Sequence, residues 1–214
     1  MGIEQLATGA AMRVTGDGAR AVVCVNGGQA HEVPGTWSAT LEWLVKRLAP
    51  ELRGLRFGEV RYRVKSWKRL DLCIDDARAA IERLDGERTL LLGFSMGGAV
   101  SIAAADEPQV EGVLGLGPWI PDRLDVSTLR GKRLDIIHGA LDRWLPGVPG
   151  VSPSSSRRGF DRALAAGAQG SYTTIPGAVH GLAVRSPGGG IVRLPRAHRW
   201  SELVGHALRR FENA

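Results

Sequence analysis

Hydrophobic positions along the chain alternate between short continuous runs and longer segments with helical spacing. The short runs, which are typical of buried strands, cover 12–14, 21–25, 60–66, 89–92, 110–116, 134–138 and 171–175. The segments with helical spacing cover 38–48, 71–84, 96–106, 155–166 and 201–212. This alternation predicts an α/β fold with a mostly parallel central sheet and helices on both of its faces.

Two local patterns refine this prediction. Thr15-Gly-Asp-Gly18 separates the first two strand-like runs and is a strong hairpin signal, so we expect these strands to pair. Within the basic segment 53–69, the residues from Arg61 to Lys65 alternate polar and apolar. Such alternation is typical of a strand with one exposed face, and an anion-binding surface is the alternative interpretation.

Composition is compatible with one soluble globular domain covering residues 1–214. The chain is 43% hydrophobic and 23% charged, and its length is enough to bury a single sizeable core. No run approaches the roughly 18 apolar residues of a membrane span. The first residues also lack the basic and apolar segments of a secretory signal, so we expect a cytoplasmic protein.

The positive charge and the cysteines add little to the functional picture. The formal charge is +6, but it comes mostly from arginines spread along the chain, so we expect no nucleic-acid partner. Cys24 and Cys73 fall in predicted buried elements and are expected to be unpaired thiols. No metal-ligand spacing occurs, and Gly115-Leu-Gly117-Pro lacks the third glycine of a dinucleotide-binding loop. We therefore predict no metal and no cofactor.

The strongest chemical signal is Gly93-Phe-Ser-Met-Gly97, which follows a strand-like run and precedes a helix of small residues. Glycines two positions before and after a serine permit a strand-to-helix turn so sharp that other side chains would collide with neighbouring backbone. The turn presents the serine hydroxyl at the end of the sheet. Ser95 is therefore the predicted nucleophile, and the alternative is a glycine turn with an incidental serine.

A serine nucleophile needs a base and an acid, which in this topology follow it in the order acid, then histidine. His180 fits the base because it lies on a short loop between a predicted strand and the last helix. Asp142 fits the acid because it comes directly after the 134–138 strand. The alternatives are Asp122 and Asp125 for the acid, and His31, His138, His198 and His206 for the base, while Asp135 lies inside a strand.

An oxyanion hole requires backbone N–H groups aimed at the developing negative charge. We expect one from Met96, directly after the nucleophile, and one from Gly28 in the loop after the 21–25 strand, with Gln29 as the second choice. Three tryptophans near predicted strand ends are candidates for the walls of an apolar substrate pocket or for simple packing: Trp67, Trp119 and Trp144.

Taken together, these motifs resemble the α/β-hydrolase family from about Ala21 to the C-terminus, most closely its small members of the dienelactone-hydrolase and carboxylesterase type. The matching pieces are Asn26-Gly27-Gly28, Gly93 to Gly97, Gly139-Ala-Leu-Asp142-Arg-Trp-Leu-Pro146 and His180-Gly181. The family usually has histidine where Asn26 stands. The resemblance implies six to eight strands and acyl-ester chemistry. Segment 117–133 is too short for the family's helical cap, which implies no cap domain and an open site.

The predicted function is therefore a serine hydrolase that cleaves a small-molecule carboxylic ester or thioester with a Ser95–His180–Asp142 triad. The alternative is a non-catalytic binding protein with the same fold. Segments 144–156 and 183–196 are rich in glycine, proline or serine, and are interpreted either as mobile covers or as ordinary surface loops. The sequence predicts neither the substrate's identity nor the oligomeric state.

Overall fold

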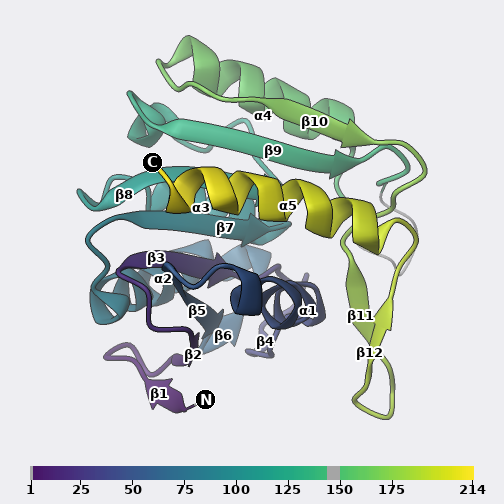
Figure 1. The fold of residues 1–214 in the computed structure, drawn as a ribbon. Helices are drawn as coiled ribbons and strands as arrows, with labels where there is room; N and C mark the ends of the chain where they lie inside the picture. Colours follow the sequence, from purple (N-terminus) through teal and green to yellow (C-terminus); the bar gives the residue numbers. More distant parts are fainter. Residues whose placement is uncertain (1, 144–149) are drawn as a thin grey trace.

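A computed structural model describes residues 2–143 and 150–214. An eight-stranded sheet in the order β1-β2-β5-β3-β7-β8-β9-β10 forms its centre (Figure 1). The six strands from β5 to β10 in this order are parallel, and β1 and β2 are antiparallel additions at one edge. The strands are β1 Ile3–Gln5, β2 Ala11–Thr15, β3 Arg20–Val25, β5 Leu55–Arg61, β7 Thr89–Phe94, β8 Val110–Leu116, β9 Arg133–Gly139 and β10 Tyr172–Ile175.

Helices cover both faces of this sheet. The first face carries α2, α3 and α4, and the second carries α1 and α5, which lies across β7 and β8 in Figure 1. The helices are α1 Ala39–Leu48, α2 Leu70–Leu84, α3 Met96–Ala103, α4 Pro153–Ala165 and α5 Ala197–Glu212, with short helical turns at Ala49–Glu51, Trp67–Arg69 and Ser127–Leu129. The predicted α/β architecture is confirmed. Only the turn at Ser127–Leu129 lies between β8 and β9, so there is no cap domain at this position.

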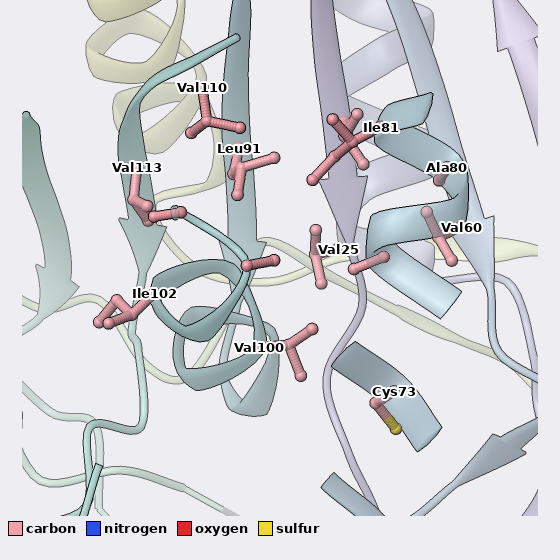
Figure 2. Close-up of a cluster of buried hydrophobic side chains, with 14 of the residues drawn as sticks. Val25, Val60, Cys73, Ala80, Ile81, Leu91, Val100, Ile102, Val110 and Val113 are labelled. Carbon is pink, nitrogen blue, oxygen red and sulfur yellow. The ribbon is translucent and has the colours of Figure 1, made fainter. Parts of the chain in front are cut away.

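Each face has its own hydrophobic core, because successive side chains of a strand point to opposite faces of a sheet. Figure 2 shows part of the first core, where Val25 and Leu91 of the sheet pack against Ile81 of α2 and Val100 of α3. On the second face, Trp200 of α5 is completely buried. Both cysteines are buried and unpaired, and they belong to different cores, Cys24 to the second and Cys73 to the first.

The predicted hairpin between the strands at 12–14 and 21–25 is wrong. Strand β2 pairs with β1 and β5, whereas β3 pairs with β5 and β7, so β5 separates the two predicted partners. A Cβ atom on Gly18 would overlap the backbone of Gly54, and one on Gly16 would come within 2.6 Å of the carbonyl oxygen of Leu55. These glycines therefore let the chain pass close to the segment that enters β5.

The basic strand predicted at 60–66 lies five residues earlier in the sequence. Strand β5 ends at Arg61, and Val64–Lys65 forms a separate short strand, β6, which pairs with β4 at Val33–Pro34. Two basic residues of this segment have acidic partners: Arg63 contacts Asp75 and Asp76, and Arg69 contacts Glu32 and Asp71. Part of the local positive charge is therefore paired within the fold.

Segment 183–196 is not the loop that the sequence suggested. It contains a two-stranded antiparallel hairpin, β11 Ala183–Arg185 and β12 Ile191–Arg193, which extends away from the sheet in Figure 1. Helix α5 begins four residues before its predicted start. Residues 144–149 of the other candidate cover, including Trp144, lie outside the described residues, and α4 begins within its remainder at Pro153. None of the described helices is long and apolar enough to cross a membrane.

Candidate active site

Ser95 occupies a strained turn between β7 and α3. Its φ of 55° and ψ of −119° lie in a region that costs a non-glycine residue about 1–3 kcal/mol. A Cβ on Gly93 would come within 2.5 Å of the Gly97 carbonyl oxygen, and one on Gly97 would overlap the carbonyl oxygen of Val25. Both flanking glycines are thus required by the backbone, which is the reason that the sequence pattern suggested. The hydroxyl-bearing residue remains partly exposed.

Backbone hydrogen bonds attach this turn to the end of β8. The N–H of Ser95 donates to the carbonyl of Leu116 at 3.0 Å, and the carbonyl of Ser95 accepts from Trp119 at 2.9 Å. Gly117 stands next to Leu116 with a φ of +50°, and a Cβ there would lie 3.1 Å from Asp142 Oδ2. The loop after β8 therefore connects the serine turn to the carboxylate predicted as the acid.

Asp142 and His180 form a closely bonded pair. Asp142 follows β9 and is 2% exposed, and His180 lies on the loop after β10. Nδ1 of His180 is 2.7 Å from Oδ2 of Asp142. The imidazole also packs against Phe94, the residue before Ser95, with ring centroids 4.9 Å apart. The three residues predicted as a triad thus meet at the carboxyl ends of the parallel strands.

The Asp142 carboxylate is buried yet favours its ionised form. Burial alone would raise its pKa, but hydrogen bonds from His138 and His180 outweigh this effect and hold the pKa below its ordinary value. The second oxygen, Oδ1, accepts from the N–H of Val151 at 2.9 Å. An ionised carboxylate on Nδ1 fixes the imidazole tautomer whose Nε2 is free to accept a proton.

The contact between the serine turn and His180 is made by Phe94, the residue before Ser95. Among the residues that the structure describes, the Ser95 hydroxyl forms no hydrogen bond with the imidazole under the usual distance and angle limits. Nucleophile–base hydrogen bonds are often long or poorly aligned before substrate binds. The contact between Asp142 and His180 is therefore the one that the acid and base of the predicted triad would make.

The loop after β3 lies against the serine turn. A Cβ on Gly28 would overlap both the Met96 side chain and the Trp67 ring, so only glycine fits. Within residues 2–143 and 150–214, neither the Gly28 nor the Met96 backbone N–H donates to another residue. These two N–H groups therefore remain available on the two segments that flank Ser95.

Asn26 explains how this loop keeps its shape. Its Oδ1 accepts from the N–H of Gly27 at 2.7 Å, and its Nδ2 donates to the carbonyl of Thr36 at 2.7 Å. Its own carbonyl accepts from the Tyr62 hydroxyl at 2.9 Å. The side-chain amide thus bonds on both sides at the position where the resembled family usually has histidine.

The other predicted residues have less defined places. Gln29 is exposed, and its carbonyl accepts from the N–H of Trp67 at 2.9 Å. Trp67 and Trp119 are partly buried next to the two loops that flank Ser95. The alternatives Asp122, Asp125, His31, His198 and His206 are all exposed on the surface. His138 is the exception, because it is buried directly beside Asp142. No group of three or more potential metal ligands occurs within the described part of the chain.

Comparisons with known proteins agree with this architecture. The sequence matches no family model, and no curated protein is similar to it. An α/β-hydrolase from a Medee basin deep-sea metagenome library is 16% identical with a TM-score of 0.72, covering 100% of this chain and 99% of that one. A Pyrococcus furiosus esterase is 15% identical with a TM-score of 0.69, covering 97% and 89% of the two chains.

A third structure, the monoacylglycerol lipase of Paleococcus ferrophilus, is 14% identical with a TM-score of 0.65, covering 97% of this chain and 98% of that one. All three resemblances span nearly the whole chain, although few residues are identical. The protein described here therefore has the α/β-hydrolase fold. This confirms the resemblance that the motifs indicated.

Proposed function

We propose that this protein is a serine hydrolase that cleaves a carboxylic ester or thioester through an acyl-enzyme. The observation that carries the proposal is the placement of Ser95, on a strained and partly exposed turn, next to a histidine bonded to a buried, ionised aspartate. A polypeptide retains backbone strain only where the surrounding structure compensates for it, and such residues cluster at functional sites. The esterase and lipase among the similar structures support the same reaction class.

The proposed first step forms the acyl-enzyme. Ser95 Oγ attacks the substrate carbonyl carbon while Nε2 of His180 accepts the hydroxyl proton, and Asp142 stabilises the resulting imidazolium through Nδ1. The carbonyl oxygen becomes an oxyanion, which the Met96 and Gly28 N–H groups are placed to receive. When the tetrahedral intermediate collapses, the bond to the alcohol or thiol breaks, and His180 returns the proton to that leaving group.

The second step releases the acid. Water replaces the alcohol or thiol, His180 Nε2 accepts a proton from it, and the hydroxide oxygen attacks the acyl carbon. Collapse of the second tetrahedral intermediate breaks the bond to Ser95 Oγ, which recovers its proton from His180. All of these transfers use side chains of this chain, and the predicted reaction requires no cofactor.

The proposed substrate is a small-molecule ester with an apolar part. Trp67 and Trp119 lie beside the loops that flank Ser95 and offer apolar surface for an acyl or alcohol group. With no cap between β8 and β9, entry to the site is open on that side. A panel of p-nitrophenyl esters and acyl thioesters of increasing chain length would rank the two bond types and the preferred acyl size.

The test of the proposal is intact-protein mass spectrometry after treatment with a fluorophosphonate. We expect one label on the wild type and none on Ser95→Ala, and we expect Ser95→Ala to lower ester turnover by roughly 10³-fold or more. His180→Ala serves as the control for activation, because it keeps the serine but removes the base. A wild type that reacts no faster than His180→Ala would instead favour the non-catalytic binding protein.

A further inference from the structure

A second histidine contacts the same carboxylate oxygen as the proposed base. His138, at the end of β9, is completely buried, and its Nε2 lies 3.0 Å from Asp142 Oδ2. That oxygen is also 2.7 Å from Nδ1 of His180. The reaction described above uses His180 and leaves His138 without an assigned role.

The contacts of His138 define where its hydrogen sits. Nε2 is 2.9 Å from the carbonyl oxygen of Val151 and 3.0 Å from the carboxylate of Asp142. Both neighbours are acceptors, so Nε2 carries the hydrogen; it donates this hydrogen to the Val151 carbonyl, and the Asp142 oxygen is a close electrostatic contact beside that bond. Within the described part of the chain, Nδ1 is buried and has no hydrogen-bond partner. All hydrogen bonding by this ring therefore passes through Nε2.

This arrangement is costly if the ring serves only to fill space. Burying a polar ring with one unpartnered nitrogen is unfavourable relative to an apolar side chain of similar size. The ring stacks on Tyr172 of β10, with centroids 6.1 Å apart and planes within 15°, and an apolar ring would make the same contact. The feature that an apolar residue could not reproduce is the Nε2–H donor beside Asp142.

His138 and Val151 together hold the carboxylate from both sides. The Val151 N–H donates to Oδ1, while its carbonyl accepts from His138, which in turn faces Oδ2. The result is a closed ring of contacts around Asp142 that leaves Oδ2 directed at His180. Together with His180, the contact from His138 lowers the pKa of Asp142 against the opposing effect of burial.

We propose that His138 is a positioning residue that orients the Asp142 carboxylate toward His180: its Nε2–H binds the carbonyl of Val151, whose N–H holds Oδ1, and lies beside Oδ2. The inference rests on the proposed hydrolase function, because its role is exerted on the triad acid. His138 touches neither the substrate nor the reacting atoms. It acts by keeping one acceptor oxygen of Asp142 aligned with Nδ1 of His180 throughout the reaction.

Two substitutions of nearly equal polarity separate donation from packing. The amide nitrogen of His138→Gln reaches about as far as Nε2 and keeps a donor near Asp142, whereas that of His138→Asn reaches only as far as Nδ1. We expect His138→Asn to lower kcat roughly 10- to 100-fold with little change in KM, since the N–H that binds Val151 and lies beside the charged carboxylate is lost. We expect His138→Gln to remain within about threefold of the wild type.

The pH profile provides a readout that loss of packing alone would not move. Without the Nε2–H donor, Asp142 holds its own proton more tightly and stabilises the protonated form of His180 more strongly. Both effects shift the acid limb of kcat/KM to higher pH in His138→Asn. The other titratable group that contacts His138 is Tyr172 of β10, whose ring also lies under Arg157 of α4, and both variants retain these residues.

The deciding experiment measures kcat, KM and the pH profile of the wild type and both variants with one p-nitrophenyl ester, beside thermal unfolding. Equal rates and profiles for the two variants would overturn the positioning role. If His138→Asn does not fold, a folded His138→Gln with a tenfold or larger loss of kcat would overturn it as well. A wild type that neither hydrolyses esters nor reacts with a fluorophosphonate would instead overturn the proposed function itself.

Discussion

Two buried carboxylates in this fold have pKa values that are shifted in opposite directions. Asp142, at the carboxyl ends of the strands, has a pKa below its ordinary value, because donors from His138 and His180 outweigh the effect of burial. Glu59, inside β5, has a raised pKa, because burial outweighs its hydrogen bonds with Arg13 of β2. Those bonds are nevertheless short and bidentate, at 2.8 and 2.9 Å.

The difference shows that the number and chemistry of the partners decide what a buried acid does. An arginine keeps its proton at all physiological pH values, so the pair in β2 and β5 only connects strands and moves no proton. Histidine exchanges protons near neutral pH, so a carboxylate bound by histidines is suited to proton transfer. We therefore expect changes at Asp142 to lower activity and changes around Glu59 to lower stability.

The largest expected effect is that of Asp142→Asn. An amide in place of the carboxylate no longer selects the productive tautomer of His180 and no longer stabilises its protonated form, so we expect kcat to fall by about 10⁴-fold. The free energy of unfolding should change much less, because most of the surrounding contacts are retained. Ester kinetics and thermal unfolding measure the two quantities. Activity within tenfold of the wild type would contradict the assignment of Asp142 as the acid.

Arg13→Met is expected to have the reverse effect. The substitution leaves Glu59 buried without its cation, and we expect the free energy of unfolding to fall by roughly 2–3 kcal/mol, a value reduced because Arg13 is partly exposed. Because Glu59 then has an even higher folded-state pKa, the folded state binds its proton more tightly than the unfolded state. The loss of stability should therefore grow as pH rises from 5 to 8.

A second substitution tests the explanation for this loss. In the double variant Arg13→Met/Glu59→Leu the carboxylate of Glu59 is also removed, and Glu42, the other contact of Arg13, keeps Lys46 and Arg185, so stability should recover to within about 1 kcal/mol of the wild type. Chemical denaturation at pH 5 and pH 8 measures both variants. The activity of the folded protein should remain unchanged in each, and a loss of turnover comparable to that of Asp142→Asn would remove the distinction between the two regions.

The sequence predicted the strand-to-helix turn at Ser95 better than the edge of the sheet, because the pattern for that turn lies within a few consecutive residues. The contacts that require glycine at positions 93 and 97 lie within the turn around Ser95 and at the end of β3. Strand β8 has its predicted bounds. The hairpin prediction failed because a turn signal at Thr15–Gly18 says nothing about which strand becomes the neighbour. Strand β5 was predicted too far along the sequence because Arg56 and Glu59 interrupt its hydrophobic pattern, although both have partners in the fold.

His138 shows that sequence patterns also fail to predict long-range contacts inside the candidate site. The sequence placed it correctly in a buried strand end but evaluated it only as an alternative base. Its spacing of four residues from Asp142 was visible, yet the contact depends on a turn after β9 that brings the two side chains to 3.0 Å. The partner Val151 comes from beyond segment 144–149, so no local pattern indicated it.

Glu42→Gln has the smallest expected effect. It extends the comparison between Asp142 and Glu59, because Glu42, like Glu59, is paired with basic side chains that stay charged at neutral pH. Burial would raise the pKa of Glu42, but hydrogen bonds from Lys46 at 2.7 Å and Arg185 at 2.8 Å lower it to about 2. A lowered carboxyl pKa contributes stability that is present above the unfolded-state value of 4.5 and is lost as pH falls toward 2.

The variant lacks this contribution, so its deficit relative to the wild type should be about 1–2 kcal/mol at pH 7 and should shrink steadily between pH 4.5 and pH 2. Denaturation curves across this range measure the difference. Arg185 is the last residue of β11, the strand that follows His180. A turnover within about threefold of the wild type would therefore show that the arginine-bound acids stabilise the fold without controlling the proposed chemistry. A large kinetic effect would mean that the two carboxylate networks are coupled through β11.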